Sequence, residues 1–168
     1  AAKLHPDRTM YLKQVMYFPI TVNECFLSAS QNIFDVNVSG YFVEAPSTIN
    51  ELLMANHLLK SNGDKRFRRW VLSSMIGHTY YHNFVTHLLE AAYQREVYKI
   101  IDNGGSVQAS TLSQIKKEVL EKFWGDDVKI IDGAELTWMR QPHYYMGLYS
   151  YTYSAGLTIA TEVSKRIL

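Results

Sequence analysis

The stretch that decides the fold is Gly40-Tyr-Phe-Val-Glu-Ala-Pro-Ser-Thr-Ile-Asn-Glu-Leu-Leu-Met54, most of which has the pattern of a helix. Pro46 fits the first turn, where its missing N–H would have had no hydrogen-bond partner. The predicted helix also carries a broad apolar surface, made of Val43, Ile49, Leu52, Leu53, Met54, Leu58 and Leu59. We therefore predict a helix that begins near Glu44, ends near Lys60 and packs on the rest of the protein.

A narrow polar stripe crosses this predicted helix. Glu44, Ser47 and Glu51 are spaced so that they lie on one side of it. Two carboxylates on so apolar a helix are costly to bury without a positive partner. A metal ion between or near them would neutralise their charge. The alternatives are a helix face that meets solvent and ion pairs with nearby Arg or Lys side chains.

The segment Phe42-Val-Glu-Ala-Pro-Ser-Thr-Ile-Asn-Glu51 resembles the third-ligand helix of the oligoendopeptidase F and thimet oligopeptidase family of zinc metallopeptidases. The resemblance runs from about Gln31 to the C-terminus and includes a Tyr-rich segment headed by Arg140-Gln-Pro-His-Tyr-Tyr145. The family binds zinc through a His-Glu-x-x-His helix and a downstream Glu. The resemblance implies that Glu44 is this zinc ligand and that Glu51 orients a zinc-binding histidine.

The sequence departs from the family at the zinc helix, because no His-Glu-x-x-His occurs in its 168 residues. The family places this motif about 25 to 29 residues before the ligating Glu, which lets two helices meet at one ion. Here that region reads Val15-Met-Tyr-Phe-Pro19. Divergence, an artificial junction and a shifted reading frame would each explain the difference. We expect residues 1–30 to be an unassigned segment and residues 31–168 to be the C-terminal part of a peptidase catalytic domain.

Tyrosines cluster near the C-terminus, at Tyr144, Tyr145, Tyr149, Tyr151 and Tyr153. Tyrosines often fill a core and hydrogen-bond at its edge, but those around one predicted helix exceed what a single buried face requires. In the resembled family a His and two Tyr of this region hold the substrate and donate hydrogen bonds to the developing oxyanion. The resemblance implies these catalytic roles for His143 and Tyr151. Tyr144, on the same helix face as Tyr151, and Tyr145 are alternatives for the other Tyr.

A second candidate metal motif is His78-Thr-Tyr-Tyr-His82, whose histidines share a helix face and could bind zinc. Thr79 stands where a general base would be needed, and His87 falls off the shared face. In the resembled family this segment belongs to a scaffold helix. We therefore favour a structural role for these histidines and keep the metal site as an alternative.

The composition narrows the class of protein. A net charge of +1 gives no indication of nucleic acid or a membrane surface as a partner. The single cysteine, Cys25, excludes an internal disulfide and fits a reducing compartment. No apolar run approaches the ~20 residues of a membrane span. The first residues, Ala1-Ala-Lys-Leu-His5, lack a signal-peptide core. A cytoplasmic location, implied by the resemblance, agrees with these features; the sequence does not indicate an oligomeric state.

We predict an all-α fold, the helical C-terminal part of a zincin-type oligopeptidase domain. A long helix is expected from about Lys65 to Asp102, another over Leu112–Trp124, and a last one from His143 to about Ile167. The resemblance implies a zinc metalloendopeptidase that hydrolyses short peptides. Because a catalytic zinc needs three protein ligands, we expect this chain to retain no zinc and to be inactive alone. The alternatives are a non-catalytic helical peptide-binding module and a metal-binding protein that uses His78 and His82.

Overall fold

The computed structural model describes residues 39–168, and that part of the chain is helical without strands. The predicted all-α class is therefore confirmed. The expectations for residues 1–30 and for the connector that follows them lie outside the described residues. The described residues divide into two compact units, residues 39–84 with Thr152–Leu168 (unit 1) and Val85–Tyr151 (unit 2). Within residues 39–168, no helix is both long enough and apolar enough to cross a membrane.

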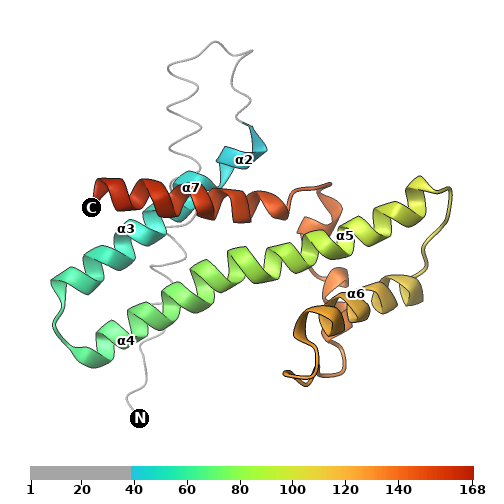
Figure 1. Cartoon of the computed structure of the whole chain (residues 1–168), viewed down its shortest axis with the longest axis horizontal. Helices are drawn as coiled ribbons and strands as arrows, with labels where there is room; N and C mark the ends of the chain where they lie inside the picture. The colour runs from blue at the N-terminus through green and yellow to red at the C-terminus, as the bar shows by residue number, and fades with distance from the viewer. Residues whose placement is uncertain (1–38) are drawn as a thin grey trace. The chain divides into compact units, whose positions relative to one another are not determined.

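Unit 1 is built around the segment that begins at Gly40 and the C-terminal helix. Its elements are α2 (Gly40–Val43), α3 (Ala45–Ser61), α4 (Lys65–Ser74) and most of α7 (Tyr151–Ile167). Figure 1 shows α7 crossing the start of α3. Pro46 lies in the first turn of α3, as predicted, and Asp64 caps α4 by accepting a hydrogen bond from the N–H of Arg66 at 3.0 Å.

Small residues make the contact between α3 and α7 close. A Cβ atom added to Gly156 on α7 would lie 3.1 Å from the backbone nitrogen of Ala45 and 3.3 Å from Cβ of Glu44. Leu157 and Ala160 of α7 and Leu52 of α3 are fully or almost fully buried. The predicted broad apolar surface is thus only partly correct. The buried side of α3 consists largely of small and polar residues: Ala45, Ser47, Thr48, Leu52 and Ala55. A close helix crossing has room for these residues but not for several large ones.

Unit 2 has its own core. It contains α5 (His87–Asp102), α6 (Ala109–Trp124), and the short 3₁₀ helices η2 (Ala134–Met139) and η3 (Pro142–Tyr145). The core is formed by Tyr93 from α5, Ile115 from α6 and Tyr144 from η3, with partly buried apolar side chains around them. The ring planes of Tyr93 and Tyr144 meet at 73° with centroids 5.0 Å apart, an edge-to-face contact favourable for aromatic pairs.

The long helix predicted from Lys65 to Asp102 is observed as three successive segments without an intervening loop. Between α4 and α5 lies η1 (Met75–Thr86), which has π-type hydrogen bonding and contains Gly77. The helix predicted at Leu112 starts slightly earlier, at Ala109, and is followed by Gly125 with φ of 54°. Glycine tolerates this left-handed backbone conformation.

The prediction of one helix from His143 to about Ile167 is wrong. His143, Tyr144 and Tyr145 belong to η3, whereas Tyr151 is the first residue of α7. The intervening segment contains Gly147 with φ of 64°, which ends the helical path. The spacing that placed Tyr144 and Tyr151 on one helix face therefore does not apply, because the two residues are on different elements.

Candidate functional site

Glu44 lies at the junction of α2 and α3, where it is both the C-cap residue of α2 and the N-cap residue of α3. Its side chain is only 8% exposed, and its backbone packs beside Gly156 of α7. Its carbonyl oxygen accepts a hydrogen bond of 3.1 Å from the hydroxyl of Thr48. The sequence-based alternative of a solvent-facing stripe is therefore wrong for Glu44. Burial of a carboxylate needs compensation by a partner charge or by hydrogen bonds.

Glu51 lies two turns further along α3 and is half-buried. Its Oε2 atom accepts a hydrogen bond of 2.7 Å from the hydroxyl of Thr79 in η1. Burial and the neighbouring charge of Glu44 raise the pKa of the Glu51 carboxyl, and the Thr79 hydrogen bond only partly opposes them. The two carboxylates thus repel each other within unit 1, and a cation held between or near them would relieve this repulsion. The chemistry of the pair fits a metal ligand and a supporting carboxylate.

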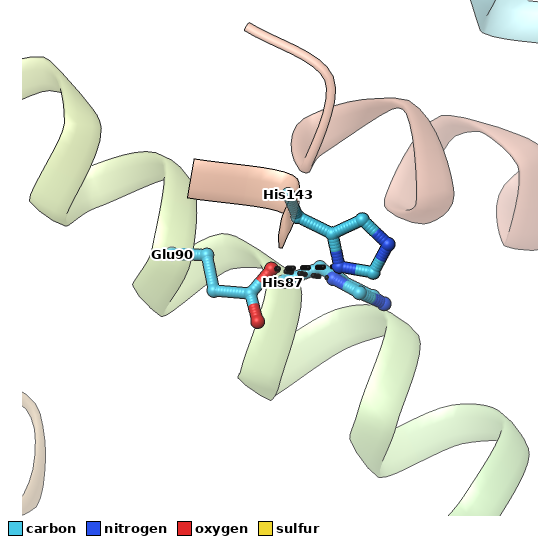
Figure 2. Close-up of side chains that lie close together, drawn as sticks. All are labelled: His87, Glu90 and His143. Carbon is cyan, nitrogen blue, oxygen red and sulfur yellow. Dashed lines mark hydrogen bonds and ion pairs between the residues drawn. The ribbon is translucent and has the colours of Figure 1, made fainter. Parts of the chain in front are cut away.

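His143 is surrounded by different chemistry, within unit 2. Figure 2 shows its ring and that of His87 turned toward the carboxylate of Glu90. Nδ1 of His87 lies 2.8 Å from Oε2 of Glu90, and Nδ1 of His143 lies 3.8 Å from the same oxygen. His87 and Glu90 are each 1% exposed, whereas the His143 side chain is 22% exposed. The two imidazole rings meet at 71° with centroids 5.2 Å apart.

Glu90 is held in its charged form by these neighbours. Burial alone would raise the pKa of its carboxyl, but the hydrogen bond from His87 and the electrostatic interactions with His87 and His143 together lower it. The buried hydroxyl of Ser150 also interacts with this carboxylate and lowers its pKa.

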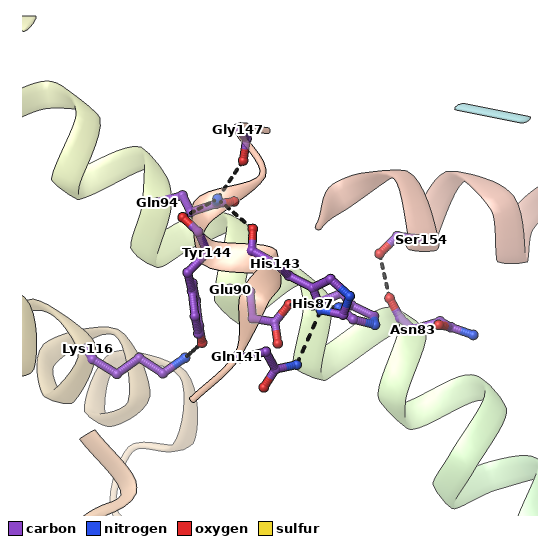
Figure 3. A network of polar contacts seen from close by, with 10 residues as sticks. All are labelled: Asn83, His87, Glu90, Gln94, Lys116, Gln141, His143, Tyr144, Gly147 and Ser154. Carbon is purple, nitrogen blue, oxygen red and sulfur yellow. Dashed lines mark hydrogen bonds and ion pairs between the residues drawn. The ribbon is translucent and has the colours of Figure 1, made fainter. Parts of the chain in front are cut away.

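Gln94 fixes the segment that carries His143. Its Nε2 atom donates to the carbonyl oxygens of His143 at 3.2 Å, Tyr144 at 3.3 Å and Gly147 at 2.5 Å. Figure 3 shows this amide on α5 beneath the turn that follows η3. One buried side chain therefore connects α5 to three carbonyl groups of a non-helical segment. This segment is the part of the chain that sequence patterns had described as helix.

Tyr144 and Tyr145 point in opposite directions. Tyr144 is buried, and its hydroxyl accepts a hydrogen bond of 2.6 Å from Nζ of Lys116 on α6. Burial lowers the pKa of Lys116 to about 8, although the charge of Glu90 opposes this shift. Tyr145 is 69% exposed and donates to the carbonyl of Trp138 at 3.2 Å. Tyr151 is half-buried at the start of α7.

Among residues 39–168, one group of three His, Cys, Asp or Glu side chains has the spacing to hold a metal ion: His87, Glu90 and His143. Neither His78 nor His82 belongs to it, and His78 is exposed on η1. Sequence reasoning set His87 aside because it lies off the face of His78 and His82. The missed signal was His87-Leu-Leu-Glu90, since residues three apart share a helix face.

Comparisons with known proteins bear on this arrangement. A family model described as Peptidase family M3 matches residues 26–168. Oligopeptidase PepF of Bacillus subtilis is 26% identical over 132 residues, 79% of this chain and 20% of the relative. An oligoendopeptidase F homolog of Borreliella burgdorferi is 27% identical over 143 residues, 84% of this chain and 24% of the relative. The chain thus spans about a fifth to a quarter of these relatives. No solved structure gives a significant match.

Proposed function

Because the chain belongs to peptidase family M3, we propose that its residues 31–168 are the C-terminal part of a zinc-dependent catalytic domain that hydrolyses short peptides. The curated relatives include an oligopeptidase and several oligoendopeptidases. The chain has no His-Glu-x-x-His in any of its residues. It therefore supplies part of a catalytic site, and the general base and two zinc ligands must come from sequence that it does not contain.

The buried acidic pair of unit 1 is the observation that carries this proposal. Glu44 lies in the position that the family resemblance gives to the third zinc ligand, and it is buried at a helix junction. Glu51 interacts electrostatically with it and is positioned by Thr79. An acidic pair that is costly to bury is consistent with a site built for a cation.

In the complete domain, Glu44 would bind the zinc ion and Glu51 would orient one of the zinc-binding histidines. When bound, such a zinc ion polarises the peptide carbonyl and lowers the pKa of its bound water. His143 and Tyr151, with Tyr144 or Tyr145, would hold the substrate backbone and donate hydrogen bonds to the oxyanion. The exposed ring of Tyr145 is more accessible to a substrate than the buried hydroxyl of Tyr144, so the structure favours Tyr145 for this role.

The first test is the sequence of the gene upstream of the codon for residue 31. We expect it to encode a His-Glu-x-x-His in some reading frame. The upstream segment joined in frame to residues 31–168 should then cleave a quenched fluorescent peptide. Glu44→Gln should abolish this activity, because three protein ligands are needed to hold catalytic zinc. Glu162→Gln, at an exposed site on α7, is the control and should leave the activity unchanged.

The isolated chain of 168 residues should show no turnover of the same peptide, with or without added zinc. Turnover that disappears with a chelator and returns with zinc would contradict the assignment of an incomplete site. A joined protein that carries the motif but has no activity would contradict the peptidase assignment itself.

The missing zinc motif also supports a second candidate, a non-catalytic helical module that binds peptides. Isothermal titration of the chain with short peptides separates this candidate from an inactive part of an enzyme. Binding that is weakened by Tyr145→Phe and by His143→Ala would support the module. Both candidates imply peptide partners and are consistent with a cytoplasmic location.

A further inference from the structure

The geometry points to a metal-binding site in unit 2, in which His87, Glu90 and His143 hold one divalent transition-metal ion such as zinc. This site does not use Glu44. It concerns the chain as it stands and is independent of the role of His143 in a complete catalytic domain. Two imidazole nitrogens and one carboxylate oxygen form a donor set found in zinc and in non-haem iron sites.

The spacing of the donor atoms fits such an ion. One donor atom from each of the three residues can be chosen so that all lie within 4.8 Å of one another. Ligands of a tetrahedral zinc ion, with bonds of about 2.0 to 2.2 Å, lie about 3.4 Å apart. The observed separations of 2.8 and 3.8 Å from Oε2 of Glu90 lie on either side of this value. Side-chain rotations that shorten the longer separations would bring the three donor atoms to this spacing.

The protein's own hydrogen bonds do not fully account for the cluster. The 3.8 Å between Nδ1 of His143 and Oε2 of Glu90 is too long for a hydrogen bond. Nδ1 of His143 instead lies 3.5 Å from the amide nitrogen of Gln141, a long contact, and the Glu90 side chain is only 1% exposed. A metal ion would draw the His143 nitrogen and the Glu90 carboxylate to a common centre, and a water could take the ion's open position.

The surrounding structure supports the ligands and leaves a way in. His87 and Glu90 lie on one face of the rigid helix α5, and Gln94, one turn further along, fixes the backbone at His143. Metal sites on rigid elements with hydrogen-bonded supports lose less entropy on binding. The partial exposure of His143 gives an ion access from solvent.

The test is a titration of the purified, metal-free chain with Co²⁺, followed by the visible absorption bands of the bound ion and by competition with Zn²⁺. We expect one equivalent to bind in a site with nitrogen and oxygen ligands. His143→Ala and Glu90→Gln should each weaken binding by at least about tenfold. His78→Ala and Glu44→Gln should leave it unchanged. Circular dichroism establishes whether each variant is folded. Because His143 is only half-buried, His143→Ala should remain folded, and its Co²⁺ affinity tests the site even if Glu90→Gln unfolds.

Several results would overturn the site. The site is disproved if the folded chain binds no Co²⁺, or if His143→Ala binds Co²⁺ as tightly as the parent chain does. Loss of binding in His78→Ala would place the ion at the His78 and His82 motif instead. Loss in Glu44→Gln would place it at the acidic pair of unit 1. None of these results depends on peptidase activity, so failure of this site and failure of the proposed function are distinguishable.

Discussion

The two buried acidic sites of this protein differ in their neighbours, which are a second carboxylate in unit 1 and two imidazoles in unit 2. In unit 1, Glu51 has another carboxylate, Glu44, as its electrostatic neighbour, and its pKa is raised, chiefly by burial. In unit 2, Glu90 has two imidazoles as neighbours, and its pKa is lowered in spite of burial. Both glutamates lie on helices and both are withdrawn from water. The comparison teaches that the partner charge, rather than burial alone, decides whether a buried carboxylate stays ionised.

The two sites also differ in how their residues are brought together. The acidic pair of unit 1 is local in sequence, with Glu44 capping the start of α3 and Glu51 two turns along it, and a hydroxyl from η1 hydrogen-bonds Glu51. The cluster of unit 2 joins residues about 50 positions apart, through a turn that Gln94 fixes.

Glu90→Gln should have the largest effect. It removes the buried carboxylate that His87 hydrogen-bonds at 2.8 Å and that lies 3.8 Å from His143, and loss of one partner from such a buried charged contact costs about 3 kcal/mol. Since the folded-state pKa of Glu90 lies below the ordinary 4.5, its contribution is present above pH 4.5 and is lost as the pH falls through the folded value. Urea denaturation at pH 7 and at lower pH measures both effects. An unchanged stability at pH 7 would contradict a stabilising contact between Glu90 and the two imidazoles.

Gly156→Val should destabilise unit 1 by about 2 to 3 kcal/mol, because the new side chain would overlap backbone atoms at the α3–α7 crossing. The nearest of these atoms is 3.1 Å from the added Cβ. Gly77→Ala is the control, because within residues 39–168 no atom beyond the neighbouring backbone of its own helix lies within 4 Å of a Cβ at Gly77. Thermal unfolding by circular dichroism should show a large loss for the first variant and little change for the second.

Gln94→Ala should cost about 2 kcal/mol, since it leaves buried carbonyl groups without their donor. It should also weaken Co²⁺ binding, because His143 would lose its fixed position. Gln114→Ala is the control, because Gln114 is exposed and its amide donates to Glu118 on the same helix. Equal stabilities for the two variants, measured by urea denaturation, would show that the turn after η3 does not depend on Gln94.

Lys116→Met tests the second ionisable group near Glu90. The pKa of Lys116 is about 8 in the folded chain against an ordinary 10.5. Between pH 8 and pH 10.5, the unfolded state therefore binds more protons than the folded state does. The parent's stability should therefore rise by about 1 kcal/mol between pH 8 and about pH 9.5, and the variant should lack this rise. Urea denaturation across this range measures it; parallel curves would disprove the assigned shift.

Glu51→Gln should have the smallest effect, and in the opposite direction to Glu90→Gln. Removing the charge relieves repulsion with Glu44 while an amide oxygen can still accept from Thr79, so stability at pH 7 should rise by less than about 1 kcal/mol. Because the folded pKa of Glu51 is raised, the parent loses stability as the pH rises above 4.5 through the folded value. Urea denaturation at several pH values should show that the variant lacks this loss. A fall in stability at pH 7 would contradict the repulsion.

Much of unit 1 could be predicted from the sequence because its signals are local. Pro46 in the first turn of α3 and the cap at Asp64 depend on residues within one turn of each other. The helix predicted from His143 to about Ile167 failed for a non-local reason. The turn after η3 is stabilised by Gln94, about 50 residues earlier, which no window along the sequence includes.

By itself, the sequence determined the helical class, the limits of α3 and the placement of two carboxylates on one side of it, because helix periodicity and caps are properties of short segments. Only the tertiary structure decided that Glu44 is buried beside a glycine of α7, and that His143 joins His87 and Glu90. Burial and partner charge arise from contacts between distant segments. They set the pKa values and the donor geometry on which any chemistry of these residues depends.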